Sequence, residues 1–191
     1  MDAELAIIDI PSEKDLTESQ EFVKTELPKY WDREYIHARM DTIDNPKHKM
    51  LATFMWMTGC RISEVIWIKK KDLDFSSYLI NIRWLKNRKY HNRSIPMHPN
   101  LRSLLQMYCG SMNLEDSLFD MSRQRAWQLI WKYFDGHPHQ IRHSFAVNWL
   151  KCGGDITVLS RMLGHSDIRI TMTYLRIVPQ DQGKELIKIT F

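Results

Sequence analysis

The stretch HPHQIRHSFAVNWL, residues 137–150, decides the fold of the last third of this chain. Its helical pattern ends before a Gly-Gly pair, so we expect a helix over residues 140–151. His139 and Arg142 stand three residues apart at the start of this helix, which places their side chains on the same side. One phosphate group can then contact both.

A second block follows, LGHSDIRITMTY, residues 163–174. The helix before it is predicted over residues 155–163, with an aspartate as its N-cap and a glycine directly after its end. His165 then lies in the turn between two helices, and Tyr174 ends a short helix predicted over residues 166–174. Together with the basic pair, these side chains can hold a phosphodiester and attack it with a phenolic oxygen.

A third block lies upstream, TGCRISEV, residues 58–65. An apolar helix is predicted over residues 47–57, and Gly59 is well placed to end it in the left-handed conformation. Arg61 therefore opens the next helix, with Glu64 one turn later on the same face. The block adds a second arginine to the candidate site.

A β-hairpin is predicted between these blocks, with strands over residues 79–84 and 93–97 and a polar, basic tip over residues 86–92 that contains Lys86. The sequence therefore predicts an α+β fold that is mainly α-helical, with a small antiparallel β-hairpin or sheet. The other predicted helices cover residues 15–27, 32–43, 101–108 and 122–134, the last one capped by Ser122.

The composition is that of a soluble intracellular protein with one core. The chain has 191 residues, of which 43% are hydrophobic, and it has no apolar run of about 18 residues. Its first four residues, MDAE, are acidic where a secretion signal is basic. The three cysteines are too few and too scattered for a disulfide framework. We therefore expect no contact with a membrane.

Charge is distributed unevenly along the chain. Residues 1–46 hold 12 Asp and Glu against 5 Lys and Arg, a net charge of −7, whereas residues 47–191 hold 22 Lys and Arg against 11 Asp and Glu, a net of +11. A basic body favours a polyanionic partner such as double-stranded DNA, because binding to phosphates releases condensed counterions. A well-solvated basic surface is the alternative.

The blocks, in this order and with these separations, resemble the tyrosine recombinases, also called the phage integrase family. The resemblance covers roughly residues 28–180, and it includes the hairpin that ends in RSIPM, residues 93–97. It implies the fold of the recombinase catalytic domain and site-specific DNA cleavage and rejoining through a 3′-phosphotyrosyl intermediate, in integration, excision, inversion or resolution. The positions that match the family's cleavage residues are Arg61, Lys86, His139, Arg142, His165 and Tyr174.

The resemblance also implies a role for each of these positions. Arg61 and Arg142 would clamp the two non-bridging oxygens, because guanidinium groups match that planar pair with two hydrogen bonds. His165 would donate to one of these oxygens, and Glu64 would help to organise the site.

Proton transfer is assigned in the same way. Tyr174 would be the nucleophile, and since a free phenol has a pKa of about 10, it must lose its proton during attack, to His139. Lys86 would protonate the departing 5′ oxygen, with Lys89 as the rival for that role. Neither a metal nor a nucleotide cofactor is required, because the phosphotyrosyl bond keeps the energy of the broken linkage.

Other basic residues are candidate DNA contacts. Solvated charged surface is the alternative for each of them. They are Arg88, Lys89 and Arg93 near the hairpin and Arg123 and Arg125 at the start of a helix.

Most tryptophans are expected to be core anchors, namely Trp56, Trp67, Trp84, Trp127, Trp131 and Trp149.

Three other functions deserve comparison. A type IB topoisomerase would share the covalent tyrosine chemistry, but the compact length and the Leu-Gly-His block favour a recombinase. A catalytically silent DNA-binding regulator of recombination is the second. The third is a zinc module built from His137, His139, His143 and Cys152. Its first two histidines are too close together in sequence for the usual spacing of zinc ligands.

The expected organisation has three parts: an acidic segment over residues 1–27, the catalytic domain over residues 28–180, and a tail over residues 181–191. The tail resembles the segment that family members dock on a neighbouring protomer, and packing on its own domain is the alternative. Most family members carry a further helical domain before the catalytic one. This chain therefore resembles the short fimbrial-inversion recombinases in size, or a catalytic fragment. The resemblance implies self-association on DNA as a tetrameric synapse, accessory DNA-bending proteins, and a cytoplasmic, nucleoid-associated location.

Overall fold

The computed structural model describes residues 27–86 and 89–178, and the side chains of residues 85–90 lie outside this description. These residues form mainly helices, together with an antiparallel sheet of strand order β1-β2-β3, which confirms the predicted mainly helical α+β class. The strands are β1 (Leu73–Asp74), β2 (Leu79–Lys86) and β3 (Lys89–Pro96). The helices are α2 (Arg33–Asp41), α3 (Pro46–Thr58), α4 (Ile62–Val65), α5 (Pro99–Tyr108), α6 (Arg123–Phe134), α7 (Pro138–Lys151), α8 (Ile156–Leu163) and α9 (Ile168–Met172), with 3-10 turns η1 (Lys70–Asp72) and η2 (Thr173–Arg176).

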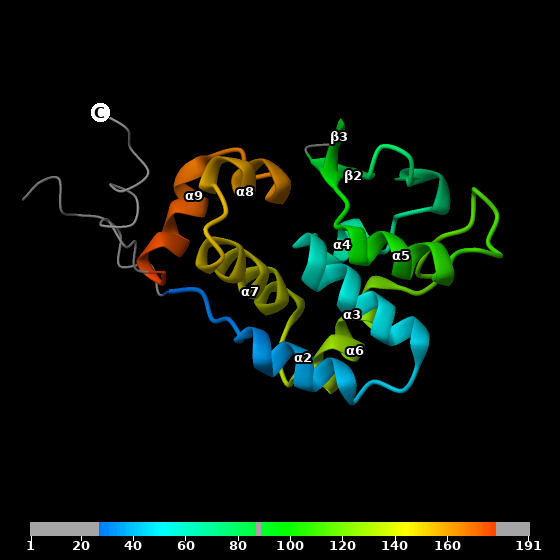
Figure 1. Ribbon diagram of the computed structural model, residues 1–191, viewed down its shortest axis with the longest axis horizontal. Helices are drawn as coiled ribbons and strands as arrows, with labels where there is room; N and C mark the ends of the chain where they lie inside the picture. The colour runs from blue at the N-terminus through cyan, green and yellow to red at the C-terminus, as the bar shows by residue number, and fades with distance from the viewer. Residues whose placement is uncertain (1–26, 87–88, 179–191) are drawn as a thin grey trace, which may run out of the picture.

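Helix α3 is the centre of the core. Asn45 caps its start by accepting hydrogen bonds from two backbone N–H groups, and Pro46 occupies its first position, where no N–H is needed. Buried residues such as Leu51 and Phe54 occupy most of its surface, so the helix is covered on several sides. It packs against α7, α5, α2 and α6, and Figure 1 shows it crossing the middle of the molecule.

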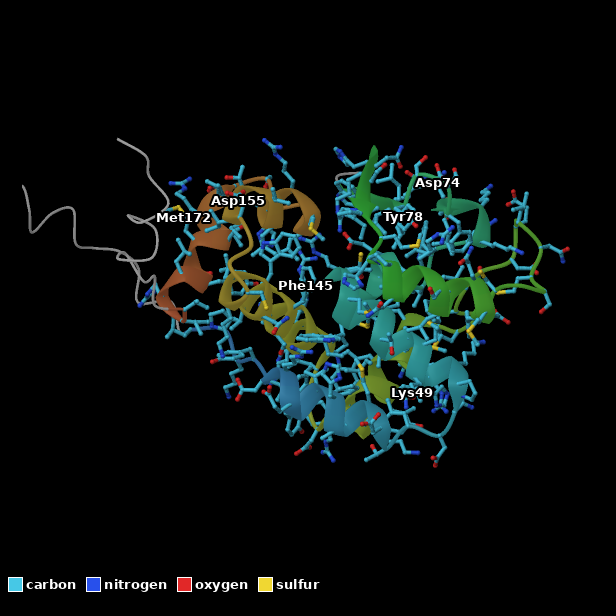
Figure 2. The ribbon with its side chains drawn as sticks, in the orientation of Figure 1. Lys49, Asp74, Tyr78, Phe145, Asp155 and Met172 are labelled. Atoms are coloured by element: carbon cyan, nitrogen blue, oxygen red, sulfur yellow. The ribbon has the colours of Figure 1, made fainter. Side chains whose placement is uncertain are left out.

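The turn after α3 brings three helices together. Gly59 ends α3 with a φ of 64°, as the sequence predicts. A Cβ atom at this position would overlap the ring of Phe145 in α7 and would lie 2.9 Å from Leu163 in α8. Phe145 is labelled in Figure 2, on α7. Because the glycine permits this close approach, the start of α4 lies beside α7 and the end of α8.

The hairpin is longer than predicted. The ladder between β2 and β3 continues through the predicted tip over residues 86–92 and reaches the pair of Lys86 with Lys89. The cross-strand pair of Trp84 and His91 stacks with ring centroids 5.4 Å apart, which supports pairing beyond the apolar part of the strands. The polar composition that indicated a tip is therefore compatible with paired strands.

Two helix boundaries also differ from the prediction. Helix α7 begins at Pro138, two residues earlier than expected, because proline is favoured at the first helical position. The predicted last helix is divided into α9 and η2, so Tyr174 lies in a 3-10 turn. The helix predicted over residues 15–27 and the tail over residues 181–191 fall outside the described residues, apart from residue 27 itself.

Three of the tryptophans expected in the core are on the surface. Trp67 is 55% exposed, Trp127 41% and Trp131 48%. Trp127 and Trp131 stack on each other along the outer face of α6, with ring centroids 5.3 Å apart.

Within residues 27–86 and 89–178, none of the helices has the length and apolar character that a membrane span requires.

Candidate active site

A basic cavity of about 810 Å³ lies between the hairpin and the segments around α4 and α8. Arg61 and His165, both predicted site residues, line it. The other arginine and histidine side chains that line it, among the described residues, are Arg83, His91, Arg93 and Arg161. Such a concentration of donors in a concave surface suits a phosphate group.

Arg142 links the three sequence blocks. It is buried, and its Nη1 donates to the carbonyl oxygen of Gly59 at 2.8 Å, while Nη2 donates to the carbonyl oxygen of Leu163 at 2.7 Å. Burial, followed by the charge of Arg61, lowers the pKa of Arg142 to about 10, so the group stays protonated at neutral pH. A fixed cation therefore lies between the turns that carry Arg61 and His165.

Glu64 holds two arginines. Its carboxylate is almost fully buried and accepts from Arg61 Nη1 at 3.0 Å and from both Nη atoms of Arg93 at 3.0 and 2.9 Å. Burial alone would raise the pKa of Glu64, but the hydrogen bonds and charge of Arg93, the backbone N–H of Arg61 and the charge of Arg142 together lower it. The carboxylate thus stays ionised and orients Arg61, whose side chain is 34% exposed.

Arg93, which was predicted to contact DNA, is bound by several protein groups. Besides its two bonds to Glu64, its Nε donates to the carbonyl oxygen of Met162 at 2.9 Å, and its guanidinium lies over the ring of Trp84. Its side chain is only 10% exposed. Each of its three nitrogens donates to a protein oxygen, so Arg93 joins β3 to α4 and α8. It also lines the basic cavity, and its contact with DNA stays a prediction. Gly164 makes room for it, because a Cβ there would lie 3.0 Å from Nη1.

His165 is held between Arg142 and Thr171. Its Nε2 lies 3.1 Å from Arg142 Nη2, and its Nδ1 lies 2.7 Å from Thr171 Oγ1. Since a guanidinium can only donate, Nε2 accepts and Nδ1 carries the proton. Burial, then the charges of Arg142, Arg61 and Arg93, lower the pKa of His165 to about 4. No sequence motif indicates Thr171, which is a buried threonine in a short helix.

The phenol of Tyr174 meets a histidine that the prediction did not include among the catalytic residues. Tyr174 is only 3% exposed, and its Oη lies 2.7 Å from Nδ1 of His143. Burial raises the pKa of Tyr174, and the charges of Arg142 and Arg61 oppose this shift. His143 stands four residues after His139, one helical turn away on the same face of α7, and this spacing is the signal that could have identified it.

His139 lies at the start of α7, as predicted, but no hydrogen bond joins it to Tyr174 within the described part of the chain. Its ring stacks on that of His143 with centroids 6.2 Å apart. Partial burial, then the charges of Arg142, His137, Arg61 and Arg123, lower the pKa of His139. The proton acceptor predicted for Tyr174 is thus one turn away from the histidine that contacts the phenol.

The remaining predicted residues lie at the hairpin and on α6. Lys86 and Lys89 are Cα partners at the end of the β2–β3 ladder, and their side chains are outside the description, as is all of Arg88. Arg123 and Arg125 are exposed in the first turn of α6, after Ser122, whose hydroxyl accepts from the backbone N–H of Arg125 as predicted. Across the described residues, no group of three or more His, Cys, Asp or Glu side chains is placed to hold a metal ion.

Stability is expected to fall when the pH is lowered from about 6.5 to about 4. The pKa of both His143 and His165 is about 4 in the folded protein, whereas an unfolded chain has the ordinary value of 6.5. The unfolded chain therefore binds more protons in this window, so the free energy of unfolding rises with pH and is lost on acidification, by at most about 3 kcal/mol for each group.

Urea unfolding at pH 7.5 and pH 4.5 measures this effect. Each of the substitutions His143→Asn and His165→Asn should reduce the difference between the two pH values. A free energy of unfolding that stays constant across the window would contradict the neutral state of both rings.

Comparison with known proteins gives one family. A model described as "Phage integrase family" matches residues 32–180 of the chain. The chain is 28% identical over 171 residues to the tyrosine recombinase XerA of Saccharolobus solfataricus, with 87% of this chain and 58% of the relative covered. It is 30% identical over 180 residues to XerA of Thermococcus onnurineus, with 85% and 63% covered. The chain thus spans less than two thirds of the length of these curated relatives.

Solved structures share the fold. The crystal structure of XerA recombinase superposes with a TM-score of 0.68 at 21% identity, covering 90% of this chain and 67% of that one. The catalytic domain of bacteriophage HP1 integrase gives 0.66 at 23% identity, with 85% and 95% covered. The XerH site-specific recombinase, in a post-cleavage complex with its difH substrate, gives 0.64 at 18% identity, with 85% and 54% covered.

Proposed function

The chain belongs to the phage integrase family, and from that premise we propose that it is a tyrosine-type site-specific DNA recombinase. It cleaves and rejoins strands through a 3′-phosphotyrosyl intermediate, in integration, excision, inversion or resolution of a mobile genetic element. The observation that carries the proposal is the position of Arg142, whose guanidinium binds carbonyl oxygens beside both Arg61 and His165. Segments from distant parts of the chain thus meet at Arg142, which supports an anion site there.

The proposed chemistry uses these groups as a fixed clamp. Arg61 and Arg142 bind the non-bridging oxygens of the scissile phosphate, where negative charge grows in the transition state. Glu64, which Arg93 also binds, holds Arg61 in place before DNA binds. Burial, followed by the charges of Arg142, Arg61 and Arg93, lowers the pKa of His165, and an anion between the arginines offsets the contribution of these charges. His165 is proposed to donate to one of the non-bridging oxygens.

Lys86 is proposed as the acid that protonates the leaving 5′ oxygen. It follows Trp84 by two positions in β2, and alternate strand positions belong to one face of a sheet. Trp84 lines the basic cavity with Arg61 and His165. Lys89 is paired directly with Lys86, so the register alone does not separate the two lysines.

Substitution of sulfur for the scissile 5′ oxygen separates them. A thiolate leaves without being protonated, so this DNA should restore cleavage by Lys86→Ala to nearly the wild-type rate, while Lys89→Ala should cleave ordinary DNA well and need no rescue. The assay compares cleavage of oxygen- and sulfur-containing duplexes of one cleaved sequence. If the sulfur rescues Lys89→Ala instead, the acid lies at position 89.

DNA is the proposed partner. The XerH structure contains its difH substrate, and the Tn1549 transposon integrase structure contains circular intermediate DNA. In this chain, the exposed Arg123 and Arg125, with Arg88 and Lys89 of the hairpin, are the proposed phosphate or base contacts. Two sites and four protomers would form the synapse, with accessory DNA-bending proteins, at the nucleoid in the cytoplasm.

A covalent-capture assay tests the function. The full chain is incubated with a pool of random-sequence duplexes, each labelled at the 5′ end of the scissile strand and nicked once so that the strands cannot be rejoined. We expect labelled DNA to remain attached to the protein on a denaturing gel. Binding of the duplex pool without any adduct would favour the silent DNA-binding regulator, and relaxation of supercoiled plasmid by single protomers would favour a topoisomerase.

A further inference from the structure

The hydroxyl of the proposed nucleophile is engaged by a histidine outside the six predicted cleavage residues. Tyr174 Oη and His143 Nδ1 are 2.7 Å apart, and the two rings have centroids 5.8 Å apart with an interplanar angle of 50°. The contact joins α7 to η2, which pack against each other. His143 is the residue next to Arg142, so a single turn of α7 carries both a phosphate-clamp cation and the partner of the phenol.

The charges around His143 keep its ring neutral. His139 and Arg142 lie on the same helix, His137 caps that helix, His165 approaches from the turn after α8, and Tyr174 comes from η2. Burial, followed by the charges of His139, Arg142 and His137, lowers the pKa of His143 to about 4. No carboxylate is among the described groups that shift this pKa. A neutral imidazole has one nitrogen that carries no proton, and this nitrogen can accept one.

We propose that His143 Nδ1 accepts the hydroxyl proton of Tyr174 as the phenolic oxygen attacks the phosphate. The inference rests on the proposed function and identifies the proton acceptor of that same site. In the step, the Oη–P bond forms, the O–H bond breaks and its proton moves to Nδ1. The P–O5′ bond breaks as the leaving oxygen takes a proton from the general acid. When the strands are rejoined, His143 returns the proton to Tyr174.

The proton moves during attack and not before it. Burial raises the pKa of Tyr174 above its ordinary value, while that of His143 is about 4, so the resting pair is neutral. Once the oxygen bonds to phosphorus, its proton becomes strongly acidic, and even a weakly basic imidazole can accept it. The bound phosphate also offsets the charge of Arg142, which raises the basicity of the ring at that moment.

The competing acceptor is His139, which the family resemblance assigns to this role. Its ring lies one helical turn earlier, is exposed, and stacks on His143. It neighbours Arg142 and the exposed Arg123, whose charges both lower its pKa. This position suits contact with the DNA phosphate better than contact with a phenol that is buried behind His143.

Substitution by asparagine is the test, because its amide occupies the place of Nδ1 and keeps a hydrogen bond but cannot accept a proton. His143→Asn is compared with His139→Asn and with the control His37→Asn, which changes an exposed histidine of α2. Adduct formation is measured with the nicked duplex pool. We expect a loss of a hundredfold or more at pH 7 for His143→Asn, with the rate rising about tenfold per pH unit up to pH 9 as phenolate forms.

The outcomes are distinguishable. The adduct rate of wild-type protein and of His37→Asn should change less than threefold over this pH range, and DNA binding should stay constant in His143→Asn and His37→Asn. A rate of adduct formation by His143→Asn within threefold of wild type overturns the proposal, and so does a loss of rate that does not depend on pH. A rate that rises with pH in His139→Asn but not in His143→Asn also overturns it. Absence of an adduct with the wild-type protein would instead overturn the proposed function.

A measurement on the unaltered full chain makes the test independent of how the variants fold. The ¹⁵N chemical shifts of the His143 ring report which nitrogen carries the proton. An unprotonated Nδ1 at pH 7 supports acceptance of the phenolic proton. A protonated Nδ1 overturns it, because that nitrogen would then donate to Tyr174 Oη.

Discussion

Tyr174→Phe is expected to abolish the covalent protein–DNA adduct and to leave DNA affinity within a few fold of wild type. The substitution removes only the hydroxyl oxygen, which is the nucleophile in the proposed reaction. The ring is 3% exposed and keeps its packing, while the lost hydrogen bond to His143 costs about 1 kcal/mol of stability. Adduct formation is followed with the nicked duplex pool, and affinity with the same pool by gel shift.

Matched controls come from two other tyrosines whose hydroxyls are hydrogen-bonded. Tyr108 Oη donates to the carbonyl oxygen of Leu118 at 2.9 Å, and Tyr133 Oη lies 3.0 Å from Nδ1 of His48. Tyr108→Phe and Tyr133→Phe should both retain adduct formation. An undiminished adduct in Tyr174→Phe, with loss in either control, would assign the nucleophile to that other tyrosine.

The arginine clamp gives the second large effect. Arg61→Ala and Arg142→Ala should each lower the rate of cleavage by about a hundredfold or more, equivalent to about 3 kcal/mol of lost transition-state stabilisation. Single-turnover cleavage of the nicked duplexes measures this rate. Exposed Arg33 on α2 provides the control, since Arg33→Ala removes the same group far from the site. Losses of less than tenfold in both clamp variants, with folding intact, would be incompatible with a phosphate clamp.

The two clamp variants should differ in stability. Arg142→Ala leaves two carbonyl oxygens, those of Gly59 and Leu163, without their donor in the interior, which costs about 1–3 kcal/mol for each group. Arg61 is 34% exposed and its partner Glu64 keeps Arg93, so Arg61→Ala should cost little. Urea unfolding of both variants checks this difference, and equal losses would contradict it.

The sequence by itself determined the local structure and the chemical groups of the site. Helix ends follow from single residues whose effect depends only on near neighbours. Gly59 and Gly164 adopt positive φ, and Ser122 and Asp155 each accept a hydrogen bond from the backbone N–H three residues later. The order and spacing of the blocks also indicated the family and its mainly helical α+β fold, which the family match and the solved structures confirm.

The packing of separate elements determines which side chains of the site bind each other. Arg93, a predicted DNA contact, also binds Glu64 and the Met162 carbonyl. His143, which stands beside a predicted site residue in sequence, contacts Tyr174. These bonds join residues 69, 29 and 31 positions apart. Spacing along one helix or strand fixes only which side chains share a face. Which donor is already occupied, and which histidine meets the phenol, depends on how separate elements pack.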